Sequence, residues 1–377
     1  MEQTLLWESN NNASNGVGQC HAETQLAFED ARNKMYTADG QNEYNNVFNI
    51  EPKLGSTSTP DLDASNFLST IFGSFQGIIQ YTFDDQGKST ENKTDGLNVA
   101  NLCRIMVGNG NYSQRLKQVY DWEQSWDTYG YNSSDPFDND YWADIDPFRN
   151  TSFYGDLAYM RGWMWLSCNE FGWLQTTDNN GIFQNLIPLS FYLKQCQDMF
   201  NASIDAVYVQ NQVSATFQRL GLPQNYRATN VVLPNGSLDP WSTLGCNVTV
   251  ESQHQYARTT VGGAHCVDMY PYDPSKYPEN TVEPTDVSKT IQLVKQEVAY
   301  YITLPSPFDG SNNGGNSNPT TPTNNNTATS PANNNTATSP ASDKTDPVTS
   351  PNEGASMTSV SMSTVFLGIL IYFVNLF

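Results

Sequence analysis

The chain has 377 residues, of which 18 are basic and 39 acidic, giving a formal net charge of −21 at pH 7. This excess of acid argues against a nucleic-acid partner, because no cluster of Lys and Arg is available to neutralise phosphates. Aromatic residues make up 12% of the chain, which is enough to build a sizeable hydrophobic core.

The first part of the chain is expected to be helical over residues 20–82. The stretch CHAETQLAFEDARNKMY carries apolar residues at helical spacing, and ASNFLSTIFGSFQGIIQYTF has the composition of a largely buried helix. Residues 127–155 are dense in Asn, Asp, Pro and Tyr, which indicates loops.

From about residue 156 the chain becomes more apolar and aromatic. SIDAVYVQNQVSATFQRLG predicts a helix that ends at Gly221. ATNVVL and QYARTTV are β-branched runs that each end in a Gly-containing turn, as strands do. A closing amphipathic helix follows, with Thr285 or Asp286 as its N-cap. Its apolar face is expected to hold Val287, Ile291, Val294 and Val298.

After Pro305 the composition collapses into Asn, Thr, Ser, Pro and Gly, and the segment NNNTATSPA occurs twice in tandem. Residues 305–356 are therefore expected to form a disordered stalk. The apolar tail within 357–377 is too short for the ~20 residues of a spanning helix. Small residues from Gly354, a polar spacer and this tail are laid out as a GPI-attachment signal, with Gly354 as attachment residue. A weak membrane tail is the alternative.

The cysteines and sequons point to the secretory pathway. Six Cys occur without any Cys-x-x-Cys, and there are only three His, so neither a metal nor another cofactor is expected. An even number of Cys predicts disulfides and an oxidising compartment, and Asn-x-Ser/Thr sequons agree. Glycosylation is expected at Asn12, Asn92, Asn111, Asn132, Asn150, Asn201 and Asn247. The predicted location is extracellular or at the cell surface, with the lysosome as the alternative.

Two strand ends present chemically useful side chains. VVLPNGSLDPWSTLG places Asp239 after an apolar run, and TTVGGAHCVDMY places His265 after a tight turn. An acid and then a His on successive strand ends is the order of the last two triad members in an α/β-hydrolase. Each residue alone is more often a turn residue or a structural His. Together they predict a catalytic acid and a catalytic base.

NGSLDPWSTLG and GGAHCVDMY resemble the prolyl carboxypeptidase / dipeptidyl peptidase II family of serine exopeptidases. WMWLSCNEFGWLQT and LCRIM extend the resemblance, which covers about residues 15–304. It implies an α/β-hydrolase fold with an inserted helical cap. Residues 1–19 would be a remnant of the hydrolase domain or a linker, 20–155 the cap, and 156–304 the C-terminal half of the hydrolase domain.

The resemblance also implies roles for individual residues. Trp241 and Trp173 would line a substrate pocket, where an apolar aromatic slot suits proline or a small apolar residue; core packing is the alternative for Trp173. By analogy, the disulfides would be Cys20–Cys103, Cys168–Cys196 and Cys246–Cys266, the last tying the Asp239 loop to the His265 loop.

The chain departs from this family in one respect. The nucleophilic Ser should precede the acid on a Gly-x-Ser-x-Gly turn, and no such motif occurs in the sequence. The opening MEQTLLWESNNNASNG also lacks the basic and apolar regions of a secretory signal. We therefore expect that the beginning of the protein is missing. The chain as given should be marginally folded and inactive, because a triad without its Ser loses most of its rate.

The sequence thus predicts a serine exopeptidase that cleaves peptide substrates next to proline or small apolar residues. Whether it is a carboxypeptidase or a dipeptidyl peptidase stays open, as does whether two copies form a homodimer. Its membrane contact would be the C-terminal lipid anchor. The competing hypothesis is a non-catalytic, GPI-anchored surface binding protein built on a hydrolase-derived scaffold.

Overall fold

The computed structural model describes residues 1–11, 16–82, 96–127, 130–155, 157–178, 181–269 and 287–305. The predicted tail with Gly354, all but the first residue of the predicted stalk, and the sequons at Asn12 and Asn92 lie outside these ranges. Both candidate N-caps of the last helix, Thr285 and Asp286, lie outside them as well.

The first part of the chain is helical, as predicted. Its helices are α1 (Glu2–Asn11), α2 (Cys20–Lys34), α3 (Ala38–Phe48), α4 (Pro60–Gln80), α5 (Val99–Met106) and α6 (Tyr112–Asp127). Helix α3 is capped by Thr37, whose side chain accepts a hydrogen bond from the Gly40 amide. Helix α4 begins with Pro60, whose missing N–H costs nothing in the first turn.

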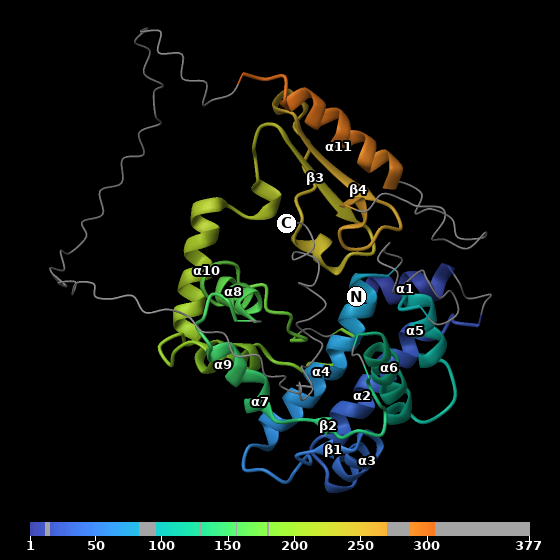
Figure 1. Ribbon diagram of the computed structural model, residues 1–377. Helices are drawn as coiled ribbons and strands as arrows, with labels where there is room; N and C mark the ends of the chain where they lie inside the picture. The colour runs from blue at the N-terminus through green and yellow to red at the C-terminus, as the bar shows by residue number, and fades with distance from the viewer. Residues whose placement is uncertain are drawn as a thin grey trace, which may run out of the picture. The chain divides into compact units, whose positions relative to one another are not determined.

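Helix α4 runs through the core of this helical region, and α2 and α6 lie beside it in Figure 1. Aromatic side chains from several elements meet there, and Phe28, Phe48, Phe67 and Phe75 are fully buried. Their rings pack edge to face, with centroids 5.0 Å apart in the Phe28–Phe75 pair and 5.0 Å apart in the Phe48–Phe67 pair. Edge-to-face contacts of this kind add to the stabilisation from burial alone.

The segment 127–155, expected to be loops, contains short regular elements. Strand β1 (Ile50–Glu51) pairs in parallel with β2 (Phe137–Asp138), and α7 (Tyr141–Ile145) and η2 (Asp146–Arg149) follow. Phe137 is only 3% exposed and packs on Phe67. Tertiary packing therefore organises a stretch whose local composition favours turns.

The second part begins with α8 (Ala158–Leu166), a π-helical turn η3 (Ser167–Phe171), α9 (Leu189–Met199) and α10 (Ala206–Leu220). Helix α10 ends at Gly221, as predicted, and this residue has a φ of +81° that favours glycine. Disulfides Cys20–Cys103 and Cys168–Cys196 are both present, so two of the three expected pairings are formed.

Two further strands carry the predicted acid and base. Strands β3 (Val231–Gly236) and β4 (Gln255–Thr260) pair in parallel, with Val231 opposite Gln255 and Gly236 opposite Thr260. The 3₁₀ turns η5 (Pro240–Leu244) and η6 (Glu251–Gln253) lie between them. Helix α11 (Val287–Tyr301) packs along this pair in Figure 1.

The inner face of α11 differs from the prediction at one position. Val287 is buried, but Val298 is 47% exposed. The face toward the strands instead includes Thr290, whose Oγ1 lies 2.7 Å from the Thr260 hydroxyl, and Glu297, which contacts His254. Residues 287, 290, 294 and 297 follow the helical period, so Val298 falls one position beyond the contact face.

The fold is therefore α/β, mostly helical, with two short pairs of parallel strands in the described part of the chain. Among the described residues, none of the helices combines the length and the apolar character that a membrane span requires.

Candidate functional site

Asp239 is held at the carboxyl end of β3. The chain leaves the strand after Gly236, and the Leu238 amide donates to the Gly263 carbonyl of the neighbouring loop over 2.9 Å. Asp239 is the N-cap of η5, and its Oδ1 accepts a hydrogen bond of 2.8 Å from the Trp241 amide. Oδ1 is thus bound by the backbone of the turn, and this hydrogen bond fixes the direction in which Oδ2 points.

His265 follows the carboxyl end of β4. Its loop lies directly against Gly236, because a Cβ at that position would come within 2.5 Å of the carbonyl oxygens of Gly263 and Ala264. The His265 amide donates to the carbonyl of Gln80, the last residue of α4, over 2.9 Å. Only glycine at position 236 allows the two loops to approach this closely.

The structure brings the predicted acid and base together. The Nδ1–H of His265 donates to Asp239 Oδ2 over 2.9 Å, across 26 positions of sequence. The two side chains are 26% and 10% exposed, respectively. Because Nδ1 is used by the carboxylate, Nε2 is the ring nitrogen that would exchange a proton with a nucleophile.

The surroundings of His265 favour its protonated form. Burial lowers the pKa of its imidazole, but hydrogen bonding to Asp239 and to the Cys266 side chain outweighs burial and raises the pKa to about 10. An imidazolium facing a carboxylate is the state that forms in a serine hydrolase when the nucleophile gives up its proton.

Three tryptophans form an apolar wall beside this pair. Trp241 lies 6.1 Å from Trp173 and 6.0 Å from Trp163 between ring centroids, and all three are half-buried. Trp173 also stacks on Phe171 at 4.4 Å. Both tryptophans named from the sequence are therefore here, together with Trp163, which sequence reasoning missed. No periodicity or motif distinguishes Trp163 from a residue that only packs.

Gln80 links the tryptophan wall to the base and was also missed. Its Oε1 accepts a hydrogen bond of 2.8 Å from Trp241 Nε1, while its backbone carbonyl binds the His265 amide. Because an indole N–H only donates, the amide oxygen must face Trp241. Gln80 is 4% exposed, and its Nε2 has no hydrogen-bond partner. A polar residue ending the apolar run of α4 was the available signal.

The first helix also contacts the acid loop. Thr4 Oγ1 donates to the Leu238 carbonyl over 3.1 Å. The surroundings of Asp239 therefore include residues from the start of the chain, from β3 and from the end of α4.

The expected Cys246–Cys266 disulfide is wrong for this structure, because both residues are free thiols. Cys246 Sγ lies 4.0 Å from the side-chain amide of Gln255, the first residue of β4, whereas Cys266 follows the far end of that strand. The length of β4 separates the two sulfurs, and a disulfide cannot reach that far. The two loops are instead held by the Asp239–His265 and Leu238–Gly263 hydrogen bonds.

The remaining candidate positions concern metal binding and glycosylation. In the described ranges, no group of three or more His, Cys, Asp or Glu side chains is placed to hold a metal ion. Asparagines of the predicted glycosylation sites within these ranges are all exposed, namely Asn111, Asn132, Asn150, Asn201 and Asn247.

An acid and a base joined on adjacent parallel strands form a pair of the kind that serine hydrolases use. The profile of the serine carboxypeptidase S28 family matches residues 8–283. The chain therefore belongs to the serine carboxypeptidase S28 family.

Its relatives carry serine protease names. A putative serine protease of Caenorhabditis elegans is 35% identical over 309 residues, which are 79% of this chain and 54% of that protein. A second one from the same organism is 28% identical over 268 residues, 69% of this chain and 50% of the relative. The human thymus-specific serine protease is 33% identical over 119 residues, 31% of this chain and 22% of that protein. The chain spans about half the length of the two Caenorhabditis elegans relatives.

Proposed function

We propose that this chain is the C-terminal part of a serine-type exopeptidase with an α/β-hydrolase fold and a helical cap. Asp239 would be its triad acid and His265 its base, and a segment outside this chain would supply the nucleophilic Ser. The observation that carries the proposal is the 2.9 Å hydrogen bond between Asp239 and His265 on adjacent strand ends. Membership in a family of serine carboxypeptidases supports it.

In the proposed reaction the seryl hydroxyl attacks the scissile carbonyl while His265 Nε2 accepts its proton. The resulting imidazolium is stabilised by Asp239, in keeping with the raised pKa of His265. His265 then gives the proton to the leaving amine, and water hydrolyses the acyl-enzyme by the same route. Because the base must be neutral to start the cycle, the rate should increase with pH as His265 loses its proton.

The neighbouring side chains fit a peptide substrate. The three half-buried tryptophans around Trp241 offer an apolar surface for a proline ring or a small apolar residue. Gln80 would hold this surface next to the base, because its Oε1 accepts a hydrogen bond from Trp241 Nε1 and its backbone carbonyl accepts one from the His265 amide.

We also propose a secretory destination and a GPI anchor at Gly354. The two disulfides are typical of an oxidising compartment. The exposed sequon asparagines are accessible to glycosylation, which needs surface positions. Release of the native protein from cells by a phosphatidylinositol-specific phospholipase would be the expected result. Retention on the membrane after that treatment would contradict the anchor.

A fluorophosphonate probe, which reacts with activated serines, tests the catalytic proposal. Native protein isolated from its source should be labelled, and peptide mapping should find the label on a Ser outside the 377 residues. The His265→Gln variant of that protein should lose the label, while the chain expressed alone should show none. A folded native protein that resists labelling would instead support the non-catalytic binding protein.

A further inference from the structure

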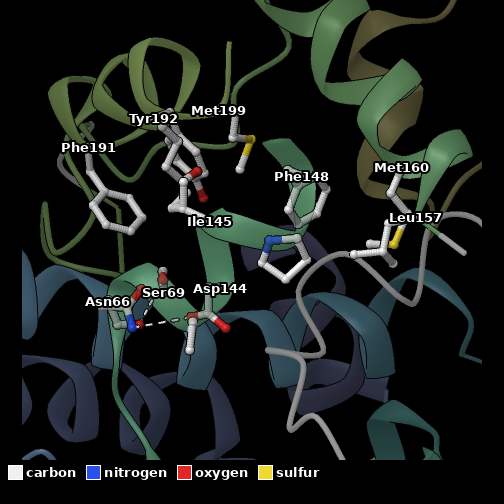
Figure 2. A pocket seen from close by; sticks show the side chains of 13 residues that line it. Asn66, Ser69, Asp144, Ile145, Phe148, Leu157, Met160, Phe191, Tyr192 and Met199 are labelled. Carbon is white, nitrogen blue, oxygen red and sulfur yellow. Dashed lines mark hydrogen bonds between the residues drawn. The ribbon is translucent and has the colours of Figure 1, made fainter. Parts of the chain in front are cut away.

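Helix α4 is held by its neighbours along its length, so its last residue, Gln80, has a defined position. Of the 21 residues of this helix, 17 are buried. Near its start, Asn66 Nδ2 donates to Asp144 Oδ2 of α7 over 3.4 Å, and Figure 2 shows these two side chains turned toward each other. Further along, Ser74 Oγ donates to Glu123 Oε2 of α6 over 3.2 Å.

Four hydrogen bonds join Gln80, Trp241, Asp239 and His265 into a closed ring. Asp239 Oδ2 accepts from His265 Nδ1 over 2.9 Å, and Asp239 Oδ1 accepts from the Trp241 amide over 2.8 Å. Gln80 Oε1 accepts from Trp241 Nε1 over 2.8 Å, and its backbone carbonyl accepts from the His265 amide over 2.9 Å. A displacement of one member must therefore strain or break a hydrogen bond to the next.

Gln80 is the member of this ring that lies outside both strand-end loops. Its side chain is buried, and its carbonyl is at the C-terminal end of α4, where the last carbonyls of a helix lack partners within the helix. The His265 amide satisfies this carbonyl. The ring of the next residue, Tyr81, lies 5.8 Å from the His265 ring at an angle of 76°. The base is thus seated directly on the end of α4.

We propose that Gln80 is a positioning residue that couples the tryptophan wall to the acid–base pair. While the Trp241 indole is held, the Trp241 amide keeps Asp239 Oδ1 bound and Oδ2 turned toward His265. Gln80 relates the position of the indole to that of the base, because it binds both. An apolar substrate group that packs on Trp241 would therefore also orient His265. This consequence for substrates rests on the proposed peptidase function, whereas the coupling exists in the chain without substrate.

A double-variant cycle, read by NMR titration of the His265 ring in the chain, tests the coupling. Gln80→Met removes the side-chain acceptor but keeps the backbone carbonyl, and Trp241→Phe removes the indole N–H but keeps an aromatic ring. Each should lower the proton affinity of the His265 ring roughly threefold, because Asp239 is then held less firmly. The double variant should show the same loss as each single variant, since all three lack the same hydrogen bond.

Gln76→Met is the matched control. Gln76 lies one turn earlier on α4, is buried as well, and its side chain donates to Gln175 instead of binding Trp241. This variant should leave the pKa of His265 unchanged. The titratable side chains that act on or contact His265 in the described part of the chain are the same in every variant, namely Tyr81, Asp239, Cys266 and Asp268.

Three results would overturn the coupling. The first is an unchanged His265 pKa in the single variants, which would leave Gln80 with a structural role only. The second is a double variant in which the two losses add, because Gln80 and Trp241 would then act on His265 independently. The third is an equal loss in Gln76→Met, which would trace the change to a general loosening of α4. The two single variants remove the hydrogen bond from opposite sides, so either one can test it if the other does not fold.

The native protein separates this coupling from the proposed peptidase function. There, Gln80→Met should slow the labelling of the nucleophilic Ser by a fluorophosphonate several-fold, whereas Gln76→Met should not. Labelling of Gln80→Met as fast as that of the wild type would contradict a role in orienting the base. If the folded wild-type protein is not labelled at all, the peptidase function fails, and the pKa cycle in the chain still decides the coupling.

Discussion

The helical region around α4 and the β3–β4 pair are built in different ways. In the helical region Phe28, Phe48, Phe67 and Phe75 are fully buried, and the Cys20–Cys103 disulfide joins α2 to α5. Along β3, by contrast, only Gly236 is buried, and the other five residues are half-buried. Parallel sheets are normally covered on both faces. The proposed acid and base thus lie at the ends of the less buried strands, and not in the region with the fully buried core.

The comparison teaches how the pair is positioned. The sheet does not hold Asp239 and His265 through a deep core. The two side chains are held by direct hydrogen bonds between their loops. The hydrogen bond from the His265 amide to Gln80, at the end of α4, also holds the base. The well-packed region thus supplies a fixed point for the base.

The largest effect is expected from Phe67→Ala. Phe67 is fully buried and packs on Tyr44, Phe48 and Phe137, so its loss should lower the free energy of unfolding by about 3–5 kcal/mol. Leu233→Ala on half-buried β3 should lower it by only about 1 kcal/mol. Urea denaturation of both variants measures the contrast. Equal losses would show that the two regions are equally well packed.

Removal of the first disulfide is expected to have the next largest effect. The Cys20–Cys103 bond closes 83 residues of sequence, so the double variant Cys20→Ala/Cys103→Ala should lose about 2–4 kcal/mol of stability. Cys266 is a free thiol, and Cys266→Ser should change stability by less than about 1 kcal/mol. Thermal unfolding without reductant measures both. A large loss of stability in Cys266→Ser would indicate that Cys266 forms a disulfide bond.

A smaller effect, confined to the strand pair, is expected from Gly236→Ala. The added Cβ would meet the backbone carbonyls of Gly263 and Ala264, so the loops must separate at a cost of about 1–3 kcal/mol. Gly162→Ala in α8 is the matched control, because nothing lies within 4 Å of a Cβ there. It should be neutral or slightly stabilising. A Gly236→Ala chain as stable as this control would mean that the two loops are not in close contact.

Sequence patterns predicted the parts of the molecule that local chemistry decides. The buried run that became α4, the Gly221 end of α10 and both strands that precede Asp239 and His265 follow from periodicity and turn residues. The proximity of Asp239 and His265 could also be expected, because the carboxyl ends of neighbouring parallel strands meet at one edge.

The parts that escaped prediction depend on contacts between distant segments. Gln80 reaches Trp241 across 161 positions of sequence, and no local pattern encodes that contact. Pairing of Phe137 with Ile50 similarly orders a stretch that looks like a loop. The Cys246–Cys266 disulfide was expected from analogy. The distance between the two sulfur atoms, however, is set by the length and direction of β4. Val298 was wrongly assigned to the buried face of α11, because the residues on that face follow the helical period and Val298 lies one position beyond it.

The pH dependence of the chain follows from the same pair. The pKa of His265 is raised from 6.5 to about 10, so its contribution to stability is fully present below pH 6.5. This contribution is lost as the pH increases through about 10. Wild-type chain should therefore become less stable between neutral and alkaline pH, and His265→Gln should lack this component of the change.

The most direct test of the acid–base pair is an NMR titration of the His265 ring in the wild-type chain and in Asp239→Asn. The wild-type ring should titrate with a pKa near 10. In Asp239→Asn the pKa should fall below that value, because burial then opposes the charged ring with only Cys266 left to raise the pKa. A His265 pKa that is the same in both chains would contradict the claim that Asp239 stabilises the imidazolium.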